Sequence, residues 1–284
     1  MTSPIQTLPD VNKPMAVIEP HQRTFMIPWR EFWQYRELLY FLVWRDIIVR
    51  YKQSVLGVGW VIFQPLLTMV IFTLFFNKLL GVSSGSTLPY PVVTYAALLP
   101  WTYFSYSVTR SSTSLVTNSH LVSKIYFPRL FIPLSYVIPG LVDFGVSFLL
   151  LLLMLTYYKI PLTGDIVLLP IALLLAIITA FGVSVWFSAL HVRYRDVQYL
   201  VPFIVQVWMY ATPIIYPINV IPLRWRWFYS LNPMVGVVQY FRRVLLGDPT
   251  FGGINWASVI IALVILVSGL LYFRATERTF ADVI

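Results

Sequence analysis

The sequence predicts an all-α integral membrane protein with six transmembrane helices. Hydrophobic residue types make up 58% of the 284 residues and charged types only 11%, whereas soluble domains hold about 45–50% and about 25%. Six stretches with at most one charge are long enough to cross a hydrocarbon core, which takes about 20 helical residues. Runs of this length do not show the alternation of membrane barrel strands. A soluble enzyme and a disordered chain are therefore excluded.

The six spans follow one another without a recognisable internal repeat, so an inverted-repeat carrier gains no support. Prolines inside the spans are expected to kink the helices rather than end them, because neighbouring helices can satisfy the freed carbonyls. The only carboxylate well inside a span is Asp143, for which a structural partner is favoured over ion coupling. The spans are expected at residues 55–76, 88–109, 130–158, 166–190, 197–218 and 254–273.

Lysine and arginine are distributed unevenly over the loops. With an even number of spans, both termini share one side, which holds 13 of these residues against 6 on the other, with Arg110 at a span end left uncounted. The positive-inside rule therefore places both termini in the cytoplasm. This asymmetry also accounts for the net charge of +9, so no nucleic-acid partner is inferred.

The region before the first span has two parts. Residues 1–28 are polar, contain five prolines and are expected to form a flexible cytoplasmic tail. Residues 29–54 place aromatic side chains on one helical face and several charges on the other, which indicates an amphipathic helix in the inner membrane interface. This helix is either a simple anchor or a platform or gate beside a channel mouth. The residues assigned to it are Trp29, Trp33, Trp44, Arg45 and Arg50.

Two loops differ from plain connections. Residues 118–129 (NSHLVSKIYFPR) form a basic loop with an apolar middle; composition favours a connector, and a helix that docks into a soluble partner is the alternative. Residues 219–253 are too apolar for a water-exposed loop and too charged for a span, so short re-entrant or interfacial helices are expected. The residues chosen in this second segment are Arg224, Trp225, Trp227, Asn232 and Pro233.

Catalytic and metal-binding motifs are missing from the sequence. There is no Gly-Lys pair and hence no phosphate-binding P-loop. Cysteine is absent, and His21, His120 and His191 are too far apart in the sequence to suggest a metal site. The sequence therefore predicts no catalytic residue, no bound metal and no cofactor in this chain.

Two spans combine aromatic rings with amides along one helical face. Rings stack on the C–H faces of sugars while amides bind hydroxyl groups, so such faces suit a sugar path. Aromatic packing between helices is the competing interpretation, and spacing alone favours it. The residues on these two faces include Trp60, Gln64, Phe72, Tyr199, Phe203, Gln206 and Tyr210.

Several segments together resemble the polysaccharide-exporting ABC permeases, a family that includes O-antigen, capsule and teichoic-acid exporters. The resemblance begins with RDIIVRYKQSVLG before the first span, which leads into Trp60 and Gln64. It continues through LVSKIYFPR and RYRDV in the cytoplasmic loops and PIIYP and LNPM in the outer segment. These matches run in the family's order from about Trp29 to the end of the chain.

This resemblance implies a type-2 ABC exporter permease fold and a homodimer that works with two copies of a separate ATPase subunit, where ATP and magnesium bind. It implies export of a lipid-linked polysaccharide from the cytoplasmic side of the bacterial inner membrane. The loop at 118–129 becomes the coupling helix, the interface helix becomes a gate element, and the outer segment shapes the exit. The expected coupling residues are Leu121, Val122, Lys124, Ile125, Phe127 and Arg129.

Three other functions stay open at this point. A permease for drug or lipid efflux shares the same architecture. An ion-coupled carrier or channel needs no partner ATPase, and one intramembrane carboxylate is thin support for it. A membrane-bound transferase needs clustered carboxylates or histidines near the interface, and the sequence has no such cluster.

Overall fold

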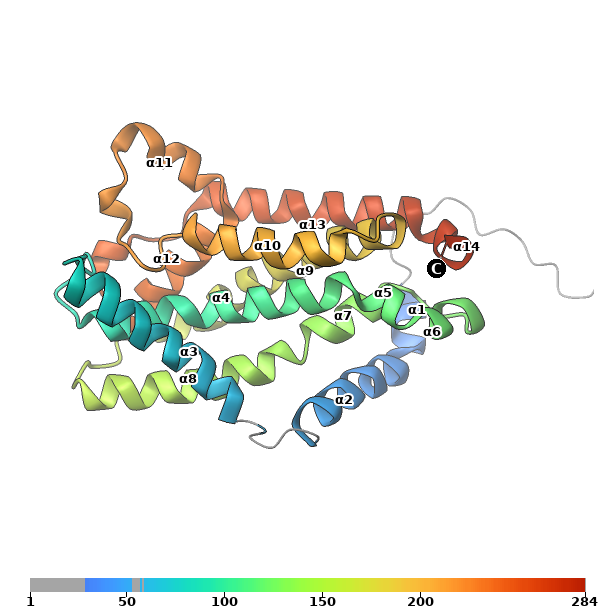
Figure 1. The fold of residues 1–284 in the computed structure, drawn as a ribbon, viewed down its shortest axis with the longest axis horizontal. Coiled ribbons are helices and arrows are strands. Elements are labelled where there is room, and N and C mark those ends of the chain that lie inside the picture. Colours follow the sequence, from blue (N-terminus) through green and yellow to red (C-terminus); the bar gives the residue numbers. More distant parts are fainter. Residues whose placement is uncertain (1–28, 53–56, 58, 284) are drawn as a thin grey trace, which may run out of the picture.

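The computed structural model describes residues 29–52, 57 and 59–283. The tail expected at 1–28 lies outside these residues, as do residues 53–54 at the end of the expected interface helix and residues 55, 56 and 58 at the start of the expected first span. Within the described part, every regular element is helical. Figure 1 shows an elongated bundle whose long helices run roughly along one axis. These are α4 (Tyr90–Ser112), α8 (Gly140–Tyr157), α9 (Leu169–Arg193), α10 (Val197–Tyr210) and α13 (Trp256–Thr276), and α3 (Gly59–Phe72) runs obliquely to them.

Within the described residues, four helical stretches are long and apolar enough to cross a membrane. Two of the six expected spans are absent from this set: α4 has 23 residues but carries many hydroxyl side chains, and α10 has only 14 residues. The four stretches are Gly59–Leu79, Phe131–Tyr157, Gly164–Arg193 and Trp256–Thr279.

Proline positions explain two departures from the expected spans. The fifth span was expected to reach residue 218, but α10 ends at Tyr210 and the chain then turns, with Ile214 N donating to Thr212 O at 2.7 Å. Pro213 and Pro217 follow within this turn, and a proline cannot donate to a helical carbonyl. Pro139 similarly separates α7 (Phe131–Val137) from α8 within the third span. By contrast, Pro65, Pro100 and Pro202 lie inside helices, as expected.

The core of the bundle forms around α4, which packs against α3, α8, α9, α10 and α12 (Pro233–Leu246). Most side chains of α4 are buried. The close pair α9 and α13 depends on glycine: a Cβ built on Gly182 would lie 2.9 Å from the backbone of Leu266. Small residues at such positions let helix backbones approach closely within a membrane.

Short helices gather at the two ends of the bundle (Figure 1). One end, called the α6 end, holds α1 (Trp29–Gln34), α5 (Ser114–Thr117), α6 (Ser119–Lys124) and α14 (Phe280–Val283). A second hydrophobic cluster holds this end together and is separate from the main core. The helix α2 (Arg36–Lys52) lies on the outside of the bundle and packs against α7.

The opposite end, called the α11 end, contains the segment expected at 219–253. This segment divides into two unlike helices. α11 (Leu223–Ser230) has no buried residue, whereas α12 is buried along almost its whole length against α4, α9 and α13. The side chain of Asn232 accepts from Met234 N at the start of α12, and Gly247 ends it with a φ of +66°, a backbone conformation that favours glycine.

Candidate functional site

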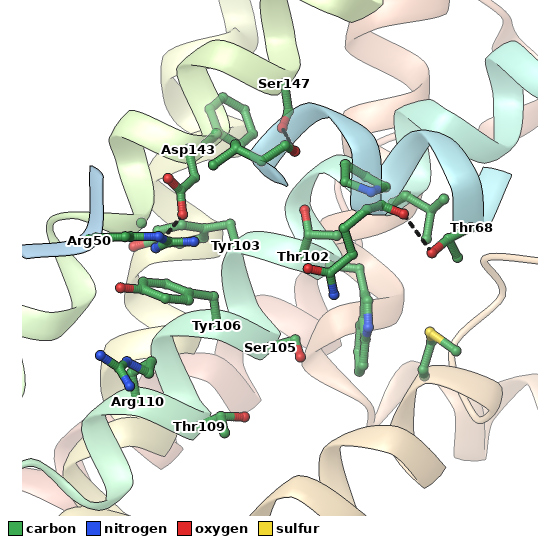
Figure 2. A pocket seen from close by; sticks show the side chains of 18 residues that line it. Arg50, Thr68, Thr102, Tyr103, Ser105, Tyr106, Thr109, Arg110, Asp143 and Ser147 are labelled. Carbon is green, nitrogen blue, oxygen red and sulfur yellow. Dashed lines mark hydrogen bonds and ion pairs between the residues drawn. The ribbon is translucent and has the colours of Figure 1, made fainter. Parts of the chain in front are cut away.

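A partly open cavity of about 370 Å³ lies between α3, α4 and α8, beside the C-terminal end of α2 (Figure 2). Its lining is mainly apolar but includes several hydroxyl, amide and charged groups, for which it is called the polar cavity. Such groups within an apolar bundle need partners or a ligand. Its polar residues are Arg50, Gln64, Thr68, Thr102, Ser105, Tyr106, Thr109, Arg110, Asp143 and Ser147.

One side of the cavity is closed by contacts between α2 and the span that contains α8. Figure 2 shows the Arg50 guanidinium between Asp143 and Tyr106. Arg50 Nη1 lies 2.5 Å from Asp143 Oδ2, and the guanidinium carbon lies 3.9 Å from the centre of the Tyr106 ring. The Tyr51 hydroxyl donates to the same carboxylate. The Asp143 carboxylate is largely buried and the Arg50 side chain is partly exposed. Asp143 therefore has the structural partner that the sequence favours, and α2 supplies it.

The interface helix also reaches the loop expected to dock a partner. Arg45 Nη2 donates to Asn118 Oδ1 at 3.1 Å, directly before α6. Burial raises the pKa of the neighbouring Asp46, although the guanidinium groups of Arg45 and Arg110 oppose this shift. On the outer face of α2, Trp44 is exposed and stacks on Tyr40. Trp33 in α1 is also exposed, which suits helices that lie in a membrane interface.

The structure separates the expected coupling residues into two groups. Lys124 and Ile125 are exposed, and Leu121 is half-buried. Val122 and Phe127 are instead buried in the second hydrophobic cluster, Phe127 to 4% exposure. The expectation that these two side chains insert into a partner is corrected, because a residue already packed within its own chain cannot fill another groove. Arg129 is half-buried and donates to the main-chain carbonyl of Glu277.

The two aromatic and amide faces are exposed on the surface of the bundle, with one exception. On α10, Val197, Val201 and Val205 point into the core, which leaves the opposite face outside. The residues exposed on the two helices are Trp60, Gln64, Tyr199, Phe203, Gln206 and Tyr210.

The exception is Phe72, which is only 7% exposed and packs edge-on against Phe76. Its placement on the aromatic and amide face that was expected to line a sugar path is corrected. Pro65, Met69 and Phe72 form the buried stripe of α3, so the helix turns this ring inward.

The residues chosen in the outer segment also fall into an exposed group and a buried group. Arg224, Trp225 and Trp227 are exposed on α11. Pro233 is buried, and Asn232 joins three elements: its Oδ1 accepts from Trp208 Nε1 at 2.8 Å and its Nδ2 donates to Thr212 Oγ1 at 3.2 Å. Asn232 therefore fixes the turn after α10 to the start of α12.

Sequence reasoning missed Arg242, which it counted among the outer loop charges. Arg242 is 2% exposed inside the bundle and donates to the carbonyls of Val93, Pro213 and Ile214 at 3.1, 2.7 and 2.7 Å. Two of these carbonyls, those of Pro213 and Ile214, follow the break after α10 and lack helical donors, which Arg242 replaces. The apolar run around Arg242 and Arg243 was the available signal, but it could not show which of the two arginines turns inward.

These features define an all-helical membrane protein with a polar cavity inside its bundle and exposed aromatic faces. Such an architecture is typical of transport proteins. The chain belongs to the ABC-2 type transporter family, whose model matches residues 37–246. This stretch runs from α2 to the end of α12 and therefore includes the cavity, the loop at α6 and the buried Arg242. The family membership that the sequence motifs suggested is confirmed.

Curated relatives match over most of the chain. The O-antigen export system permease protein RfbA of Myxococcus xanthus is 31% identical over 218 residues, which cover 76% of this chain and 82% of that protein. A Klebsiella pneumoniae protein of the same name is 29% identical over 253 residues, covering 87% and 95%. The polysialic acid transport protein KpsM of Escherichia coli is 26% identical over 244 residues, covering 82% and 91%.

Proposed function

We propose that this chain is the membrane-spanning subunit of an ATP-driven ABC exporter that moves a lipid-linked polysaccharide, of O-antigen or capsule type, from the cytoplasmic side across the bacterial inner membrane. The observation that carries the proposal is the alignment of almost the whole chain with permeases named for O-antigen export and polysialic acid transport. A drug or lipid efflux permease and an ion-coupled carrier are the alternatives that the experiment below must separate.

The proposed topology has six spans with both termini in the cytoplasm. The shorter α10 and the more polar α4 pack among the four apolar stretches, and α4 is shielded from lipid by its neighbours. The α6 end is cytoplasmic in this proposal because Lys124, Arg193 and Arg195 lie there on exposed positions. The chain then consists of a tail (1–28), an interface helix (29–54) and a transmembrane domain (55–284).

The energy source is proposed to be a separate ATPase subunit, present in two copies on a homodimer of this chain. ATP and magnesium bind to that subunit, since this sequence lacks a P-loop. Docking occurs at α6 and the residues that follow it. The exposed, apolar Ile125 beside the exposed cation Lys124 suits insertion into an apolar groove with a polar rim.

The polymer path is proposed to lie on the dimer axis between the exposed faces of α3 and α10. A glycan must slide, so its contacts have to be numerous and individually weak. Ring stacking meets this need, at about 0.5–1.5 kcal/mol per contact by analogy with aromatic pairs. Gln64 belongs both to the exposed face of α3 and to the lining of the polar cavity, so the cavity opens beside this path.

At the other end, α11 is proposed to lie in the outer membrane interface and to shape the exit. Its exposed Trp225 and Trp227 alternate with Arg224 and Arg226, a composition that suits the interfacial belt. In this arrangement α12 is the buried support of α11 rather than a second interfacial helix.

Reconstitution into liposomes tests the proposed function. The chain alone should neither hydrolyse ATP nor move a lipid-linked glycan, and adding its ATPase subunit should give ATP-dependent movement of the glycan to the opposite leaflet. Transport by the chain alone under an ion gradient would establish the carrier instead. ATP-driven movement of phospholipid or drug but not of the glycan would establish the efflux permease.

A further inference from the structure

The segment that follows α13 packs against the loop that we assign to ATPase docking. It consists of the turn η5 (Glu277–Thr279) and α14. α14 contacts α6 and α9, and Figure 1 shows it at the same end of the bundle. The proposed topology, ATPase docking and polymer path assign no role to this segment.

A hydrogen bond joins this segment to the loop, and a hydrophobic cluster contains side chains of both. The Arg129 guanidinium donates to the main-chain carbonyl of Glu277. The Phe280 ring is completely buried and packs edge-on against Phe273, with ring centres 5.2 Å apart. Both rings belong to the second hydrophobic cluster, which also contains the loop residues Val122 and Phe127.

The loop depends on such external contacts for its position. α6 has only six residues, and isolated helices shorter than about 12–15 residues are marginal in water. The chain leaves the helix directly afterwards, at Ile125, with extended backbone angles. Hydrogen bonding within α6 therefore cannot hold the exposed docking residues in a fixed orientation, whereas the side chains anchored in the cluster can.

We propose that residues 277–283 position α6 for the ATPase, with Phe280 as the positioning residue. This inference rests on the proposed docking function of the loop. Phe280 touches no partner, since it is buried within the chain, and it acts through the packing of Val122 and Phe127. Removal of its ring leaves a cavity beside these residues, and a loosened α6 then presents Lys124 and Ile125 in many orientations. Binding of the ATPase is then weaker, because the loop must become ordered when the complex forms.

A spin label on α6 tests this positioning directly. The chain contains no cysteine, so the exposed Ser123 can be replaced by a single labelled cysteine in the full-length protein in lipid nanodiscs. Phe280→Ala should increase the motion of this label and weaken ATPase binding by about tenfold or more. The matched control is Val283→Ala, because Val283 lies on the same short helix but is exposed; it should change neither quantity.

Two further variants keep the proposal falsifiable. Phe280→Leu retains most of the apolar volume and should give a smaller increase in label motion, which can be measured if Phe280→Ala does not accumulate. Glu277→Ala removes the ion pair of this side chain with Arg274 but keeps the main-chain carbonyl that Arg129 binds, so the label should stay close to the order that it has in the parent protein. Unchanged label motion in both Phe280 variants would overturn the positioning role. Normal ATPase binding by Ile125→Asp would instead overturn the docking assignment, so the two failures are distinguishable.

Discussion

Arg50 and Asp143 form an ion pair between the interface helix α2 and α8, with 2.5 Å between Nη1 and Oδ2. The pair joins residues 93 positions apart, counted from the two residue numbers, and it lines the polar cavity. Because Arg45 of the same helix binds Asn118 beside α6, α2 connects the proposed docking loop to the cavity. The same helix therefore contacts both the residue before α6 and the cavity wall.

Asp143→Asn should destabilise the protein by about 1–3 kcal/mol, since the largely buried Asp143 carboxylate binds both the Arg50 guanidinium and the Tyr51 hydroxyl. Thermal unfolding of the purified protein in detergent measures the effect. The control is Asp165→Asn, which breaks a more exposed pair with Arg243 and should cost about 0–1 kcal/mol. The exchange Arg50→Asp with Asp143→Arg should recover part of the loss; no recovery would argue against a direct interaction.

Ile125→Asp and Phe127→Asp should fail in different ways. Ile125 is 53% exposed, so its variant should fold normally and lose ATPase binding when the charge enters an apolar groove. Phe127 is buried, and a carboxylate there should cost about 3–5 kcal/mol through the lost ring and the buried charge. Pull-down of the ATPase and thermal unfolding separate the two effects. Equal stability of both variants would contradict the burial of Phe127.

Arg242→Met should destabilise the α11 end by about 3 kcal/mol or more, because the carbonyls of Val93, Pro213 and Ile214 lose their donor. Arg242→Lys keeps the charge, but an ammonium lacks the planar guanidinium that binds three carbonyls. This variant should therefore be more stable than Arg242→Met and less stable than the parent protein. Arg243→Met is the matched neighbour, and it should change stability by about 0–1 kcal/mol. Hydrogen exchange of residues 211–217 locates the effect; protection equal to the parent in Arg242→Met would contradict it.

Alanine at Phe203 or Tyr210 should lower export of the polysaccharide while folding and basal ATPase activity of the complex stay close to the parent level. Both rings are exposed on α10, so their removal leaves no cavity in the core. Phe72→Ala should instead lower stability by about 3–5 kcal/mol, since its ring is buried. Surface polysaccharide in cells is the measurement. If alanine variants along the exposed faces of both α3 and α10 export polysaccharide at the parent level, the polymer path lies elsewhere.

Single cysteines placed from 219 to 253 should distinguish α11 from α12. In α11, labelling by membrane-impermeant thiol reagents should follow helical periodicity, with protection on the face turned to lipid. In α12, labelling should be weak throughout, because the helix is buried within the bundle. The absence of native cysteine gives a clean background. Uniform labelling of α11 would show that it stands in water.

Composition and periodicity alone determined the protein class, the approximate places of the long helices and the amphipathic character of α2. These properties are local, because lipid solubility and helix formation depend on nearby residues. The family was suggested by the resemblance of short motifs in and beside α2, α6 and α10. Sequence reasoning could also place Tyr199, Phe203 and Tyr210 on one face of α10, since helical spacing fixes which side chains point together.

Only the tertiary structure decided what each face packs against. Phe72 and Phe127 are aromatic residues like Phe203, yet they are buried because neighbouring elements cover them. Arg242 and Arg243 are adjacent, but only Arg242 meets the carbonyls freed by the break after α10. Arg50, which pairs with Asp143, and Arg129, which binds the main-chain carbonyl of Glu277, both come from distant parts of the chain. Helical periodicity gives the direction of a side chain but not its neighbour, and that neighbour sets whether a ring or a charge serves the core or the surface.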